Sequence, residues 1–140
     1  MQSHVKRRII VFGGAAVVAA GFGALNATKA PAGFEERVMT VAQMKDTGGL
    51  IVDIRTPEEW ADTGVIDGAM LVTFESPDSF MAQVGPEISD GRDLILICRS
   101  GNRTRRAAEM LAGTIPNQII SIQGGMSAQI KSGYQTVSVE

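Results

Sequence analysis

The residue best placed to carry out chemistry in this chain is Cys98, the single cysteine among 140 residues. It follows four aliphatic residues, 94–97, whose composition is typical of a buried strand. A helical pattern of apolar residues then runs from 105 to 112. Open α/β sheets bind ligands at this carboxyl end of their strands. The position therefore favours a reactive thiol over a buried structural cysteine, which is the usual role of a lone thiol.

A short polar loop joins the expected strand to the expected helix. Its backbone N–H groups can turn inward and form an anion-binding site at the start of the helix. These N–H groups, the helix dipole and two guanidinium groups would all stabilise a thiolate on Cys98 and so make it a nucleophile. The loop residues that we expect to form this site are Arg99, Ser100, Gly101, Asn102, Arg103 and Thr104.

Two charged residues lie at the end of another expected strand, 50–54. In a parallel sheet this end meets the same edge as Cys98. Asp53 could accept hydrogen bonds from the loop or pair with Arg103, and Arg55 could face the same pocket. Both could equally belong to a surface turn. We expect Asp53 and Arg55 as supporting residues of the site.

The composition excludes several classes of site. A single cysteine rules out an intrachain disulfide and a cysteine-rich zinc site. The one histidine, His4, lies near the start of the chain, so the remainder has no Cys–His pair and no histidine metal site. We expect no metal and no cofactor. Residues 31–140 hold nine of the 13 basic residues and all 15 acidic ones, which argues against nucleic-acid binding.

Residues 1–30 are expected to be a signal peptide or an N-terminal membrane anchor. Lys6, Arg7 and Arg8 precede an uncharged run over 9–25. The run is short for a spanning helix, which needs about 20 residues, and long for the apolar core of a signal peptide, about 7–15 residues. Either way, the basic flank would stay in the cytoplasm of a bacterium and the remainder would face the periplasm. Uncleaved, residues 9–25 would hold the protein in the inner membrane.

The remainder predicts one α/β domain over 37–140, after a linker over 31–36. Thr40 and Thr56 are expected to cap short helices, and Pro57 suits a first helical position. Asp78 or Ser79 is expected near the start of a further helix, 78–84. Strands alternating with short helices indicate a largely parallel sheet covered on both faces. The expected strands are 50–54, 69–74, 94–97 and 118–122, and the later helices are 104–112 and 126–130.

Three stretches, in order along the chain, carry a resemblance to a known family. Residues 50–60 look like that family's strand with Asp-Val-Arg and the helix start that follows it. Residues 64–69 are similar to its Gly-His-Ile-Pro-Gly-Ala stretch, and residues 98–104 to its active-site loop. Gly124 and Gly125 follow, and we expect them to let the backbone approach the site closely. Over residues 36–140 the chain resembles the single-domain rhodaneses, a family of sulfurtransferases.

The sequence departs from the family pattern at three positions. Val65 replaces the usual histidine and Asp67 the usual proline, which we expect to alter a loop without altering the chemistry. Gln129 stands where a tryptophan commonly follows the two glycines. Packing or a partner surface near the active loop would differ there.

The resemblance implies a rhodanese-like fold, an open, mainly parallel five-stranded sheet with helices on both faces. It also implies the transfer of a sulfane sulfur from a donor such as thiosulfate to a thiol or cyanide acceptor, through a persulfide on Cys98. Arg99 would meet the anionic donor or leaving group, and Arg103 would brace the loop and add positive potential. The implied partners are a small sulfur donor and a thiol acceptor.

Other classes of protein remain in view. The strongest alternative is a noncatalytic rhodanese-like binding or sulfur-carrier module for a partner protein of the cell envelope. A cysteine phosphatase places five residues between its cysteine and arginine, whereas four separate Cys98 from Arg103. A loop of that size suits a sulfur atom better than a phosphate group. A disulfide oxidoreductase lacks support because the chain has no second cysteine.

The expected export can be tested with reporters fused after Glu140. An enzyme that is active only outside the cytoplasm should be active in this fusion, because the basic flank of residues 1–30 holds the amino terminus inside. Activity of a cytoplasmic reporter at the same position, with the exported reporter silent, would contradict export. Membrane fractionation with N-terminal sequencing then distinguishes an anchor from a cleaved signal.

Overall fold

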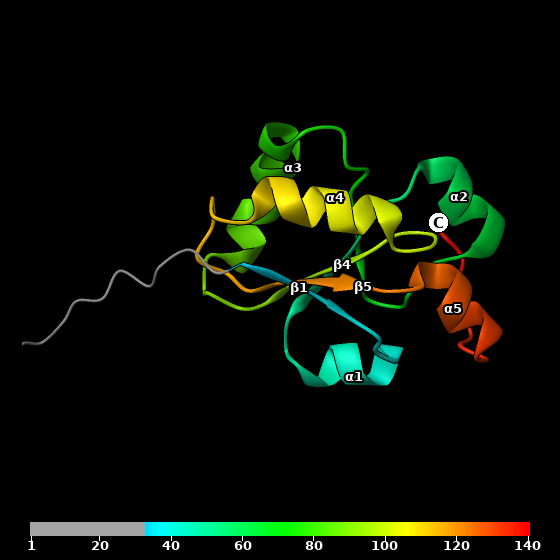
Figure 1. Ribbon diagram of the computed structural model, residues 1–140. Helices are drawn as coiled ribbons and strands as arrows, with labels where there is room; N and C mark the ends of the chain where they lie inside the picture. Colours follow the sequence, from blue (N-terminus) through cyan, green and yellow to red (C-terminus); the bar gives the residue numbers. More distant parts are fainter. Residues whose placement is uncertain (1–32) are drawn as a thin grey trace, which may run out of the picture.

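The computed structural model describes residues 33–140, which form a five-stranded sheet with the strand order β1-β5-β4-β2-β3 (Figure 1). Every pair of neighbouring strands is parallel. This confirms the expected α/β class and the five-stranded parallel sheet. The strands are β1 (Phe34–Arg37), β2 (Leu50–Asp53), β3 (Met70–Leu71), β4 (Leu94–Ile97) and β5 (Ile119–Ile122).

Helices cover both faces of the sheet. In Figure 1, α3 (Pro77–Val84) and α4 (Asn102–Leu111) lie above the strands, and α1 (Val41–Asp46) and α5 (Gly125–Lys131) lie below them. The helix α2 (Pro57–Thr63) lies at the end where β4 runs into α4, and a 3₁₀ turn, Gly85–Ile88, follows α3. The carboxyl ends of the strands therefore meet α2, α5 and the start of α4.

The central strand β4 separates two apolar cores. Leu94 and Leu96 pack with residues of α3 and α4, while Ile95 and Ile97 pack with residues of α1 and α5. All four side chains are fully buried. A central parallel strand with helices on both faces reads as a continuous apolar run, which is why residues 94–97 were recognisable as a strand.

Local hydrogen bonds fix where the helices begin. Thr40 forms a capping box with Gln43, and the Thr56 side chain accepts from the N–H of Glu59. These two caps confirm the prediction. The expected helix over 78–84 is confirmed as α3, but its cap is Ser76, whose hydroxyl accepts from the N–H of Ser79, and not Asp78 or Ser79. Pro77 then takes the first helical position, where its missing N–H costs nothing.

The outer strands differ from the expected pattern. β1 begins at Phe34, inside the range 31–36 that was expected to be a linker. Its outward-facing residues are charged and exposed, so the segment lacks the apolar alternation that indicates a strand. At the other edge, the strand itself covers only Met70–Leu71 of the expected range 69–74, although the N–H groups of Val72 and Phe74 still donate to the carbonyl oxygens of Asp53 and Ile54. The helix α4 begins at Asn102, two residues earlier than the expected range.

The expected signal or anchor segment, residues 1–30, lies outside the described residues and stays a prediction. Within residues 33–140, no helix combines the length and the apolar composition needed to cross a membrane.

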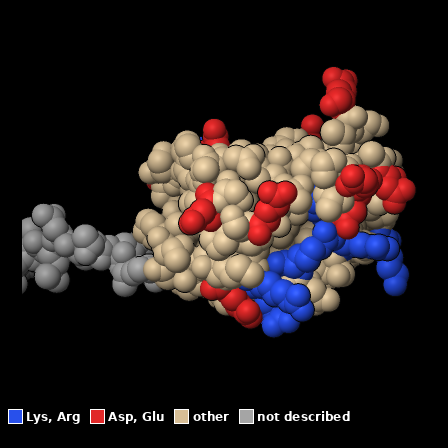
Figure 2. All heavy atoms as spheres, turned by 90° about the horizontal axis from the view of Figure 1, so that it is seen from above, with Lys and Arg blue, Asp and Glu red and all other residues tan. Residues whose placement is uncertain are grey.

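Charged side chains are unevenly spread over the surface. Figure 2 looks down on the side of the sheet that carries α3 and α4. On this face Lys and Arg side chains gather in one band, and Asp and Glu side chains are scattered around it. Four of the chain's basic residues lie between positions 99 and 106, in the loop after β4 and the first turns of α4.

Candidate active site

Cys98 lies directly after β4, where the strand turns into α4, and it has no exposed surface. The backbone N–H of Gly101 donates a hydrogen bond to its Sγ at 3.1 Å. Gly101 has φ 103°, and a Cβ on it would lie 3.2 Å from both the backbone N of Gly124 and the carbonyl oxygen of Ile122. Only glycine adopts this conformation freely in so narrow a space. The loop therefore turns one backbone N–H toward the sulfur.

Two hydroxyl groups extend the polar environment of the thiol. The Oγ1 of Thr104 lies 3.7 Å from the Cys98 Sγ and donates to the carbonyl oxygen of Gly101 at 3.0 Å. Ser121, on β5, donates its hydroxyl to Thr104 Oγ1 at 2.8 Å. Thr104 and Ser121 are both buried. Ser121 was not predicted, and its one sequence signal is a polar residue among the isoleucines of a buried strand.

The start of α5 supports the loop from the other side. The N–H of Met126 donates to the Cys98 carbonyl oxygen at 2.7 Å, and the N–H of Ser127 donates to that of Arg99 at 3.0 Å. Gly125 has φ 55°, and a Cβ on it would collide with the carbonyl groups of Cys98 and Arg99. The expected close approach at the two glycines is confirmed. It lets the N–H groups of α5 donate to the carbonyl groups of the loop, while the N–H of Gly101 donates to the sulfur.

Arg103 braces the loop through an ion pair with α2. Its guanidinium donates to both carboxylate oxygens of Glu59, at 2.8 and 2.9 Å. Glu59 was not predicted, because it lies 44 residues earlier in the chain. Burial alone would raise the pKa of the Glu59 carboxyl. Its pKa is nevertheless below the ordinary 4.5, because several effects together outweigh burial and lower it. These are the hydrogen bond and charge of Arg103, a backbone hydrogen bond involving Thr56 and the charge of Arg55.

Asp53 pairs with Arg55 and not with Arg103. The guanidinium of Arg55 contacts both carboxylate oxygens of Asp53, at 2.8 to 3.1 Å, and both side chains are buried. Arg55 also donates to the Thr63 hydroxyl at 2.7 Å and to the Gly64 carbonyl oxygen at 2.9 Å. The alternative of a surface turn was therefore wrong. The pair instead fixes the carboxyl end of α2 to the end of β2.

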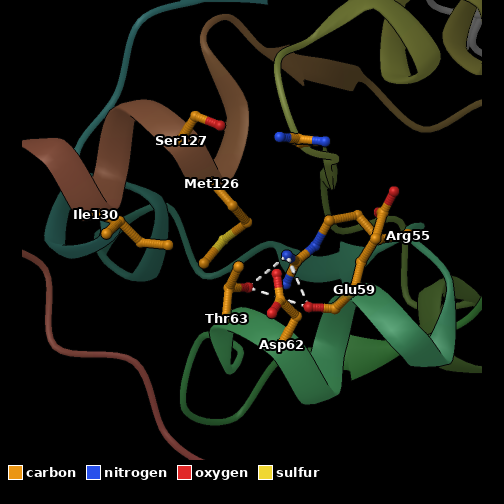
Figure 3. Close-up of a pocket in the computed structure, with 8 residues that line it drawn as sticks. Arg55, Glu59, Asp62, Thr63, Met126, Ser127 and Ile130 are labelled. Carbon is orange, nitrogen blue, oxygen red and sulfur yellow. Dashed lines mark hydrogen bonds between the residues drawn. The ribbon is translucent and has the colours of Figure 1, made fainter.

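A cavity of about 140 Å³ opens between α2, α5 and the loop (Figure 3). Arg55 and Glu59 lie on one side of it, and Met126 and Ile130 on the other. Arg99 lines it and makes no salt bridge with any of residues 33–140, so its charge is available to an anion. The lining residues are Arg55, Glu59, Asp62, Thr63, Arg99, Met126, Ser127 and Ile130.

The predicted loop residues play unequal parts. Gly101 and Thr104 contact the sulfur of Cys98, whereas Arg99 lines the cavity and Arg103 pairs with Glu59. Ser100 and Asn102 are exposed, and their side chains make no hydrogen bond within the described part of the chain. The N–H that reaches the Cys98 Sγ in this part of the chain belongs to Gly101, between them. Within that same part, no group of His, Cys, Asp or Glu side chains could hold a metal ion.

The ion pair of Glu59 should contribute to stability in a pH-dependent way. Its folded-state pKa is lowered, so the contribution is present above pH 4.5 and is lost as the pH falls through that lowered pKa. Glu59→Gln should remove the contribution and flatten the acid decline of the unfolding free energy. The effect should be at most about 1 kcal/mol, because both side chains are partly exposed.

Urea unfolding at about pH 7 and about pH 3.5 measures this difference. Glu58→Gln is the matched control, since Glu58 is exposed and forms no salt bridge with residues 33–140. An equal flattening in the control would show that the effect is one of net charge and not of the pair.

The comparisons with known proteins agree with this geometry. The family model of the rhodanese-like domain matches residues 37–131. A sulfurtransferase from Allochromatium vinosum is 33% identical over 91 residues, which are 65% of this chain and 80% of that protein. Thiosulfate sulfurtransferase 16, a chloroplastic protein of Arabidopsis thaliana, is 32% identical over 98 residues, which cover 64% of this chain and 80% of the relative.

Among solved structures, a protein of unknown function from Rhodopseudomonas palustris, described as a possible tyrosine phosphatase, has the same fold. It superposes with a TM-score of 0.59 at 24% identity, over 72% of this chain and 84% of that one. Identity this low shows the fold alone. The family match covers most of the described residues and includes the loop after Cys98. This chain therefore belongs to the rhodanese-like domain family.

Proposed function

We propose that the protein transfers a sulfane sulfur from an anionic donor such as thiosulfate to a thiol or cyanide acceptor, with Cys98 as the carrier. The observation that carries the proposal is the N–H of Gly101, which points at the Cys98 Sγ from 3.1 Å. A donor in this position stabilises a negative charge on sulfur, whether the sulfur belongs to a thiolate or to a persulfide. A cysteine stabilised in this way needs no histidine beside it.

The reaction proceeds in two displacements. The Cys98 thiolate attacks the outer sulfur of thiosulfate, the S–S bond of the donor breaks, and sulfite leaves with the electron pair of that bond. The new bond joins the Cys98 Sγ to the transferred sulfur. An acceptor thiolate then attacks the transferred sulfur and restores the Cys98 thiolate. The two steps involve no net oxidation and need no cofactor.

The two arginines near Cys98 have different roles in this reaction. Arg99 lines the cavity and carries a guanidinium with no carboxylate partner in residues 33–140, which suits the negative oxygens of the donor and of the departing sulfite. Arg103 is held by Glu59 and positions the loop. Because Cys98 has no exposed surface, side chains at the cavity must move before a donor reaches the sulfur.

Incubation of the full chain with thiosulfate should add the mass of one sulfur atom to Cys98. Intact-mass analysis with peptide mapping measures this directly. Cys98→Ser is nearly isosteric, so it should keep the fold, as circular dichroism would show, and should lose both the added sulfur and the thiosulfate:cyanide activity. A wild-type protein that takes up no sulfur would favour the noncatalytic binding module, and an active Cys98→Ser variant would move the chemistry elsewhere.

Arg99→Ala should lower kcat/KM for thiosulfate by about ten- to a hundredfold, the effect of losing one charge-assisted hydrogen bond of about 1.5–3 kcal/mol. A neutral organic persulfide donor should be affected less, because it brings no negative oxygens to Arg99. Arg92→Ala is the control, since Arg92 precedes β4 at the opposite end of the sheet and pairs with Asp90. Equal losses on both donors would remove the anion-binding role of Arg99.

A further inference from the structure

A second cavity lies on the other side of the Arg103–Glu59 ion pair. Glu59 lines the cavity described above, whereas Arg103 lines this second one, which has a volume of about 320 Å³. It runs between α4 and the segments that follow β2 and β3. Its residues are Ile54, Thr56, Thr73, Phe74, Arg103, Arg106, Ala107 and Met110, and we refer to it as the α4 groove.

The α4 groove combines an apolar surface with a cationic rim. The α4 residues that line it, at positions 103, 106, 107 and 110, have the spacing of one helix face. Met110 is 52% exposed and adds apolar surface to the groove. Phe74 is partly buried and packs against Phe80, with ring centroids 5.2 Å apart. Water is therefore in contact with apolar surface that a ligand side chain could cover.

One of the two cations that line the groove has no carboxylate partner among residues 33–140. Arg103 is paired with Glu59, but Arg106 forms no salt bridge with any residue of the described range 33–140. This range holds nine basic and 15 acidic residues, so its net charge is negative. Arg103 and Arg106 both lie on α4, on the face of the sheet that Figure 2 looks down on. A positive rim in a negative domain favours a small acidic ligand over an extended anionic surface, which the rest of the domain would repel.

We propose that the α4 groove docks a partner protein through a short segment in which carboxylate side chains flank an aliphatic side chain. One carboxylate pairs with Arg106, whose guanidinium can bind it in a bidentate fork. Another meets the Nε and Nη1 groups of Arg103, because Glu59 engages only Nη2 of that side chain. The aliphatic side chain covers Met110 and Phe74. The groove borders the loop of Cys98, so the docked segment lies beside that loop. Delivery of an acceptor thiol by this partner rests on the proposed function, whereas docking itself does not.

The test uses ¹⁵N-labelled full-length protein and three peptides of equal length. One alternates glutamate with leucine, and in the others glutamine or lysine replaces the glutamate. Only the acidic peptide should give saturable shifts, and these should centre on the backbone signals of Thr73, Phe74, Ala107 and Met110. Arg106→Gln should weaken the binding by about tenfold, the loss of one charge-assisted hydrogen bond. Arg92→Gln is the control with an arginine at the other end of the sheet, and it should bind as the wild type does.

Several outcomes would overturn the docking site. The first is that the acidic peptide gives no saturable shifts, or gives shifts that map to another part of the protein. The second is that the glutamine peptide binds as tightly as the acidic one, or the lysine peptide more tightly. The third is that Arg92→Gln weakens binding as much as Arg106→Gln does. Inorganic sulfate that reproduces the whole set of shifts would reduce the groove to a simple anion site. Cys98→Ser should bind the acidic peptide normally, so loss of sulfur transfer and loss of docking are separate results.

Discussion

The arrangement of the site depends on the buried ion pair between Asp53 and Arg55. It fills the space between the end of β2 and the carboxyl end of α2, where the Gly64 carbonyl oxygen also accepts from Arg55. The same helix presents Glu59, which holds Arg103 of the loop. Leaving one charge of a buried pair without its partner typically costs about 3–5 kcal/mol. The orientation of the reactive loop is thus linked to a side-chain contact inside the domain.

The starts of two helices, α4 and α5, meet at the loop that follows Cys98. The chain enters α4 through Gly101, whose N–H turns to Cys98, and it enters α5 through Gly125, whose neighbours donate to the loop carbonyl groups. Neither glycine could carry a side chain without displacing backbone of the other segment. The carbonyl groups of Cys98 and Arg99 are satisfied by backbone N–H groups of α5, which a change of side chain at an exposed position does not disturb.

The sequence was most informative where one segment determines its own structure. Residues 94–97 are buried on both faces, so their apolar run identifies β4 and places Cys98 at its end. Thr40 and Thr56 were recognisable because a capping residue acts within one helical turn. At α3, Ser76, Asp78 and Ser79 are all good capping residues, and only the backbone geometry distinguishes them.

Contacts between distant segments could not be read in this way. The pairing of Arg103 with Glu59 joins residues 44 positions apart, and that of Ser121 with Thr104 joins residues 17 apart. Several acidic residues were equally available to Arg103 in the sequence, and the plausible choice of Asp53 was wrong because that carboxylate is enclosed with Arg55. Such choices depend on how α2 packs over the ends of the strands, which no local pattern encodes.

The charged residues that made β1 hard to recognise in the sequence also affect how the domain behaves in a crowded solution. An edge strand with free N–H and C=O groups is a template onto which another chain can add and start an aggregate. Here the outer edge of β1 carries Glu35, Glu36 and Arg37, all exposed, and the opposite edge strand, β3, has only two residues. A strand of another chain would meet charged side chains at the β1 edge of the sheet and a strand of only two residues at the β3 edge. The open sheet is in this way protected against edge-to-edge association.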